Sequence, residues 1–214
     1  MRMDTDQLIR TLAADNSYRP RPVGFVLALM LLAAAPVSLL LFFSMLGVRP
    51  DVMTAMHNPF FDLKFAVTLA LAAAGVASSL HLSRPEVSLA GFGWLFAIPA
   101  ALLAAGIAGE AMMPQRLPMM TRLVGSNSRI CMTAIPLMSL PLLAASILGL
   151  RHGAPTRPAL AGAVAGAMSA GLAATFYASH CTDDSPLFVM TWYTVAASLV
   201  TAIGALAGAR FLRF

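Results

Sequence analysis

The chain has 214 residues, of which 59% are hydrophobic and only 11% are charged, with a formal net charge of +5. This balance excludes an ordinary soluble domain and indicates a protein embedded in a membrane. The 14 Lys and Arg residues stand singly between apolar runs, so the charge does not indicate a nucleic-acid-binding surface, and no direct nucleic-acid binding is expected. Residues 1–22 carry three acids and no apolar core, unlike a cleavable signal peptide.

In the N-terminal tail, residues 1–22, the apolar residues Leu8, Ile9 and Leu12 recur at helical spacing, and Pro20 prevents the helix from continuing. The pattern predicts a short amphipathic helix, which is only marginally stable alone in water. It either lies on the membrane surface or inserts these three side chains into a groove on a cytoplasmic partner. Partner binding is preferred, because the acids of the tail disfavour adhesion to an anionic leaflet.

Six continuous apolar segments are long enough to cross a membrane as helices, since a span needs about 20 apolar residues. Their continuity favours helices over the alternating strands of a membrane β-barrel. The sequence therefore predicts an all-α polytopic bundle over residues 23–209, followed by a short tail over residues 210–214. The six expected spans are approximately Gly24–Val48, Phe65–Leu82, Val87–Gly109, Ile130–Leu150, Ala159–Ala178 and Leu187–Gly208.

The basic residues near the span ends predict the orientation. With the N-terminus inside, nine Lys and Arg residues lie near inner ends and five lie near outer ends, as the preference of basic residues for the cytoplasmic side requires. Both termini are therefore expected in the cytoplasm. Gly162 with Gly166, and Gly204 with Gly208, have the small-residue spacing of closely packed helices, and packing within one chain is favoured over dimerisation.

Two charges flank the expected start of the second span. Asp62 and Lys64 are interpreted as charges of the outer interface, with the Lys64 ammonium extended toward water. A carboxylate partner for Lys64 among Asp62, Glu110, Asp183 and Asp184 is the less favoured alternative.

The chain has two cysteines, and the expected topology puts both on the outer side. Cys131 opens the fourth span and Cys181 precedes the sixth. A disulfide or a redox-reactive pair is favoured, because the outer compartment of a bacterial cell is oxidising. Two unrelated small residues are the alternative.

The segment SHCTDDSP, residues 179–186, concentrates further candidate ligands. His180, Asp183 and Asp184 accompany Cys181, so this segment could hold a metal ion, or His180 could tune the thiol. The preferred role for both aspartates is structural, at the N-terminus of the sixth span, where acids stabilise the positive end of the helix dipole.

The spans carry no Asp, Glu, Lys or Arg in their central turns, which weakens the case for a proton-coupled transporter or ion pump. Phosphate-binding, zinc-binding and Ser/His/Asp motifs are also missing from the sequence, so no enzyme is indicated. A small-molecule or ion transporter, or a periplasm-facing thiol-dependent or metal-dependent membrane protein, remains the alternative.

Several segments in order resemble one family. They are TDQLIRTLAAD, the basic entry RPRP, NPFFDLKF before the second span, a Cys that opens the fourth, and HCTDDSPLFVMTWY entering the sixth. This order is similar to that of the NrsF family of bacterial inner-membrane anti-sigma factors, whose name means negative regulator of sigma F. The block from His180 to Tyr193 is its most specific part.

The resemblance implies a multi-pass inner-membrane protein that holds an extracytoplasmic-function sigma factor until oxidants or heavy metals release it. The partners would be that sigma factor and the lipid bilayer. The paired cysteines of the family match Cys131 and Cys181, to which the resemblance assigns signal perception. No cofactor is certain, and transient heavy-metal binding at these cysteines is one expectation. The chain lacks the larger zinc-binding domain of better-known anti-sigma proteins, so inner loops such as Arg151–Arg157 could add to the sigma contacts of Leu8, Ile9 and Leu12.

Overall fold

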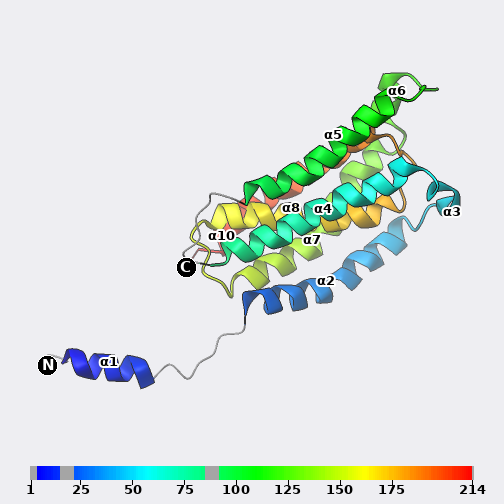
Figure 1. Cartoon of the computed structure of the whole chain (residues 1–214). Coiled ribbons are helices and arrows are strands. Elements are labelled where there is room, and N and C mark those ends of the chain that lie inside the picture. Colours follow the sequence, from blue (N-terminus) through cyan, green and yellow to red (C-terminus); the bar gives the residue numbers. More distant parts are fainter. Residues whose placement is uncertain (1–3, 15–21, 85–91, 214) are drawn as a thin grey trace.

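The computed structural model describes residues 4–14, 22–84 and 92–213, and this part of the chain is helical and contains no strand (Figure 1). Six helical segments are long and apolar enough to cross a membrane. They confirm the expected all-α bundle. The elements are α1 (Thr5–Ala14), α2 (Val23–Met45), α3 (Val52–Ala55), α4 (Pro59–Leu82), η1 (Gly93–Phe96), α5 (Ala97–Ala111), α6 (Met119–Val124), α7 (Ser128–Leu150), α8 (Pro158–Ala178), α9 (Pro186–Phe188), η2 (Val189–Tyr193) and α10 (Thr194–Phe211).

Helix α8 forms the centre of the bundle. It packs against α10, α4 and α7, while α2 packs on α7 and α5 lies at the edge, mainly against α4. The composition of α8 explains its place, because its many Ala and Gly residues let neighbouring backbones approach closely. In its most apolar stretch 67% of α8 is buried, against 17% for the segment that contains α5.

The contact between α8 and α10 depends on four glycines. A Cβ atom at Gly162 would meet the backbone of Gly204 and Gly208, and one at Gly166 would meet the backbone of Val200 at 2.6 Å. The two small-residue motifs therefore face each other within one chain. This confirms the intramolecular packing predicted from their spacing.

The second span begins earlier than expected. Helix α4 starts at Pro59, where Asn58 caps it by accepting a hydrogen bond from the backbone N–H of Phe60 at 3.1 Å, and Pro59 occupies the first helical turn. The expected start was Phe65. The earlier start places Lys64 inside the helix, with a fixed direction toward the bundle.

Other boundaries differ as well. The third span begins at Gly93, and the expected residues 87–91 lie outside the described residues. The last span begins at Pro186 and includes a π-helical turn, η2, before α10. In the tail the expected helix is present as α1, with Ile9 58% exposed. The side chains of Leu8 and Leu12 lie outside the described part.

Candidate functional site

Three connections meet at one end of the bundle: residues 46–58, 112–127 and 179–185 (Figure 1). We call this the Cys181 end. The backbone N–H of Arg49 donates to the carbonyl of Ser179 at 3.0 Å, and His180 Nδ1 donates to the carbonyl of Gly47 at 2.9 Å. The segment 179–185 is thereby tied to the connection that follows α2.

Asp184 lies at the centre of a largely buried group of charges, the Asp184 ion cluster, made of Arg49, Asp51, Lys64 and Asp184. Asp184 Oδ1 is 2.6 Å from Lys64 Nζ and 3.0 Å from Arg49 Nη1. Both cations also donate to the carbonyl of Cys181, at 2.8 and 3.2 Å. The cluster joins the connection after α2, helix α4 and the segment before α10.

Arg49 reaches outward as well as inward. Its Nη2 is 2.7 Å from Asp51 Oδ2, and this hydrogen bond holds the pKa of Asp51 at about 2. The same contact, opposed by burial and aided by Asp184, raises the pKa of Arg49 above its usual value. Both groups are therefore charged at every physiological pH. The cluster holds two cations and two carboxylates, so its charges balance.

Lys64 is not an interface charge, and the expectation that it extends toward water is wrong. Its side chain is 1% exposed, and its ammonium lies 5.1 Å from the ring centroid of Phe61. Because α4 begins at Pro59, the side chain of Lys64 is directed toward Asp184 and away from the solvent. Asp62, two residues earlier, is exposed as expected.

Neither aspartate caps the last span, so that expectation is also wrong. Ser185 performs the capping, because its Oγ accepts from the backbone N–H of Leu187 at 3.2 Å. Asp183 instead lies at the N-terminus of α7. Its Oδ2 accepts from the backbone N–H groups of Ser126 at 2.9 Å and Asn127 at 2.8 Å, which places a negative charge at the positive end of that helix.

Cys131 and Cys181 are both free and fully buried. They belong to one apolar cluster, but they do not lie next to each other, and the structure contains no disulfide between them. Burial raises the pKa of the Cys181 thiol, against a smaller opposing effect of the Lys64 charge. The thiol is therefore protonated at neutral pH.

The residues proposed for a metal site have separate partners. His180 contacts Gly47, Asp183 contacts the start of α7, and Asp184 contacts Lys64 and Arg49. Within the described ranges, no group of three or more His, Cys, Asp or Glu side chains is placed to hold a metal ion. Metal binding at the cysteines themselves stays a prediction.

Sequence reasoning missed several residues of this end. Arg49 was counted only as one outer basic residue. Two tyrosines also contribute to this end: the Tyr177 hydroxyl donates to the carbonyl of Asn127 at 3.2 Å, and its ring centroid is 5.6 Å from that of Tyr193. Tyr193 does fall in the HCTDDSPLFVMTWY block, which was its only signal in the sequence.

A second ion pair closes the connection between α5 and α7. Glu110, at the end of α5, is 3.1 Å from Arg122 of α6, and Glu110 is 4% exposed. Trp192 Nε1 donates to the carbonyl of Leu123 at 2.9 Å, which ties α6 to η2. The Cys181 end is therefore a connected polar layer over an apolar core.

The burial of the two thiols gives a direct prediction. In the folded protein, Cys131 and Cys181 should react with a maleimide at least about tenfold more slowly than a cysteine introduced at Met112, which is 87% exposed. Thiolate is the reactive form, and its fraction falls about tenfold for each pKa unit. Intact-mass analysis of Met112→Cys and of the unaltered protein measures this difference. Equal rates for native and introduced thiols would contradict the buried placement.

Comparison with known proteins gives consistent matches over the whole chain. The family model described as "Negative regulator of sigma F", NrsF, matches residues 12–214. The "Anti-sigma-F factor NrsF" of Caulobacter vibrioides (strain NA1000 / CB15N) is 35% identical over 215 residues, covering 99% of this chain and 100% of that protein. The "Probable anti-sigma-F factor NrsF" of Azospira oryzae (strain ATCC BAA-33 / DSM 13638 / PS) is 30% identical over the same shares. No solved structure matches significantly.

Proposed function

Because the chain belongs to the NrsF family of negative regulators of sigma F, we propose that it is a membrane-bound anti-sigma factor that sequesters an extracytoplasmic-function sigma factor. The similarity over almost the full length of two anti-sigma-F factors is the observation that carries this proposal. The protein acts by binding and not by catalysis. It resides in the bacterial inner membrane with both termini in the cytoplasm, where a sigma factor is present.

The N-terminal helix is the proposed docking element. Helix α1 carries Leu8, Ile9 and Leu12 at helical spacing, and Ile9 is 58% exposed. An amphipathic helix of this kind binds a partner by laying its apolar side chains into a groove. The rest of the described chain consists of membrane spans and short connections. Helix α1 is therefore the most accessible candidate for binding a partner.

The Cys181 end is the proposed sensor. Cys131 lies in the first turn of α7, and Cys181 lies in the segment that leads into the last span. An oxidant or a thiophilic metal ion that modifies these thiols replaces buried apolar contacts with larger or polar groups. That change favours a different packing of the helices over the resting one.

The packing of α2 against α7 supports a route from the thiols to the tail. The cluster that contains both cysteines also contains Phe42 of α2, and Ser38 of α2 donates to the carbonyl of Met138 of α7 at 2.9 Å. Helix α2 follows the tail in the chain. A signal that favours one packing of α2 and α7 by about 1.4 kcal/mol changes the ratio of the two states about tenfold.

The sensing role is tested by replacing each cysteine and measuring expression from the sigma-dependent promoter, with and without oxidant or metal. We expect Cys131→Ser and Cys181→Ser to lose most of the induction, because the reactive group is gone. Cys131→Ala and Cys181→Ala serve as second variants that bury no hydroxyl. Membrane accumulation of each variant is the control for folding. Full induction in all four variants would refute the sensing role.

The docking role is tested in the tail. We expect the Leu8→Asp and Leu12→Asp variants to release the sigma factor and give constitutive promoter activity, because a charge cannot enter an apolar groove without a large desolvation cost. Arg10→Gln is the matched control in the same helix and should keep repression. Capture of the sigma factor by the detergent-solubilised protein gives the direct measurement. Unchanged capture by both Asp variants would place the docking surface elsewhere.

A further inference from the structure

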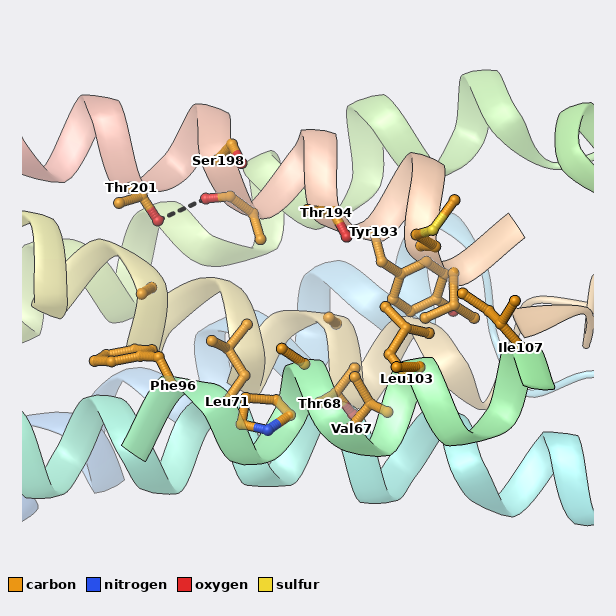
Figure 2. A pocket seen from close by; sticks show the side chains of 18 of the residues that line it. Val67, Thr68, Leu71, Phe96, Leu103, Ile107, Tyr193, Thr194, Ser198 and Thr201 are labelled. Atoms are coloured by element: carbon orange, nitrogen blue, oxygen red, sulfur yellow. Dashed lines mark hydrogen bonds between the residues drawn. The ribbon is translucent and has the colours of Figure 1, made fainter. Parts of the chain in front are cut away.

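An apolar groove of about 600 Å³ lies between α5 on one side and α4, α8 and α10 on the other (Figure 2). Figure 2 shows Phe96 of η1 and Leu103 of α5 across from Tyr193 and Thr201 of the last span. The lining contains no charged residue. Such a surface selects an uncharged, apolar occupant.

The groove exists because α5 stands away from the centre of the bundle. Helix α5 contacts mainly α4, and α8 presents Ala163, Ala167 and Ala174 to the groove, where longer side chains would fill the space. Along this edge the lining extends from Phe96 of η1 to Ile107 of α5, which is about 16 Å along a helix axis. This length is about half of a hydrocarbon core of about 30 Å, the depth of one leaflet.

The groove is open to the side. Ala100 and Ala104 on α5, and Thr194 and Ser198 on α10, line it and are also exposed. In a membrane these side chains face hydrocarbon, so the occupant enters from the bilayer.

One end of the groove adjoins the cluster that holds the two cysteines. Val189 and Tyr193 belong to both, and Leu103 packs against the cluster from α5. Tyr193 is 5% exposed, and its hydroxyl interacts with the Cys181 thiol. An occupant of the groove therefore contacts side chains that pack around Cys131 and Cys181.

From this geometry we propose that the groove binds one acyl chain of a membrane phospholipid, held between α5 and α10 with its end against Tyr193. The bilayer supplies this ligand, and the size, depth, side opening and uncharged lining of the groove fit it. The bound chain supports α5, which otherwise has few contacts. The inference does not depend on the sigma partner, and its failure would leave the proposed function intact.

Native mass spectrometry of the full chain, purified in a mild detergent, tests this. We expect one phospholipid retained per chain in the unaltered protein. Ala104→Leu, which fills the groove, should reduce the retained fraction at least about fivefold, whereas Ala101→Leu, exposed on the same helix outside the groove, should retain it. No retained molecule, a retained isoprenoid quinone in place of a phospholipid, or equal loss in the two variants would overturn the proposal.

A second measurement needs no variant. The unaltered protein is reconstituted in phosphatidylethanolamine vesicles that contain a phosphatidylcholine with a diazirine on one acyl chain, and is then irradiated. We expect cross-links at Met190 and Tyr193, of which Tyr193 is buried from the bulk lipid. Cross-links confined to side chains outside the groove would overturn the proposal even if the variants fail to fold.

Discussion

Replacing Asp184 with Asn is expected to destabilise the protein by about 3–5 kcal/mol. Asp184 is the carboxylate shared by Lys64 and Arg49, whose side chains are 1% and 6% exposed. Without its charge, the ammonium of Lys64 stays buried with only the Cys181 carbonyl and the neutral amide as partners, and a buried unpaired charge is costly. Denaturant unfolding of the detergent-solubilised protein, followed by tryptophan fluorescence, measures the change.

Two further variants distinguish the cost of an unpaired buried charge from the cost of losing an exposed ion pair. Asp51→Asn removes a carboxylate that also contacts Arg49 but is 54% exposed, and it should cost far less stability than Asp184→Asn. Lys64→Met combined with Asp184→Asn should be more stable than Asp184→Asn alone, because the buried charge is removed. If Asp51→Asn costs as much as Asp184→Asn, the cluster does not stabilise the fold in this way.

The number, helical character and approximate ends of the spans were predictable because they depend on local hydropathy. Each apolar run must satisfy its own backbone hydrogen bonds in lipid, so composition alone determines a helix there. The spacing of Gly162, Gly166, Gly204 and Gly208 also predicted which surfaces meet. The residues that predict the spans and the glycine contact each lie within one or two short segments of the sequence.

Lys64 shows why the charged site was not predictable in the same way. Averaged hydropathy places the start of the second span at Phe65, directly after the charged Lys64. It therefore predicts that the Lys64 side chain is exposed to water. The pair Asn58 and Pro59 is a helix-start signal that would have moved the boundary, because Asn caps a helix and Pro suits its first turn. Even with the correct boundary, the pairing of Lys64 with Asp184, 120 residues later in the chain, depends on how the helices pack.

Asp183 and Asp184 show a second limit. Two adjacent acids before a proline fit a helix N-terminus, but the rule does not say which helix they serve. Ser185 caps the helix that follows in sequence, Asp183 serves α7, and Asp184 pairs with cations from two other elements. Local rules gave the right type of residue and the wrong partner.

The cysteines were predicted to share one side of the protein, and the structure places both in one buried cluster at the Cys181 end. Their bonding state was open from the sequence, because a disulfide requires a specific separation of the two Cα atoms. Two buried free thiols mean that an oxidant or metal ion must gain access before it reacts. The Asp184 ion cluster and the Asp183 contacts cover this end, so these contacts would have to open before the sensing proposed above.

The close contact of α8 and α10 leads to the second large effect, which is expected for Gly166→Ala. A Cβ atom there would lie 2.6 Å from the carbonyl oxygen of Val200 and 2.8 Å from the Cα of Thr201, and these are backbone atoms that cannot move aside alone. The helices must separate, which costs about 1–3 kcal/mol of stability. This loss opposes the gain of up to about 1 kcal/mol that Ala offers over Gly inside a helix.

Gly109→Ala is the matched control, because a Cβ atom at Gly109 in α5 meets nothing within 4 Å. It should be neutral or stabilising by up to about 1 kcal/mol, through helix propensity alone. Unfolding in the same detergent compares the two. If Gly166→Ala stabilises the protein as Gly109→Ala does, then α8 and α10 are not held at the short distance that the glycines permit. The close packing at the centre of the bundle would then not be the rigid support on which α4 and α7 position the Cys181 end.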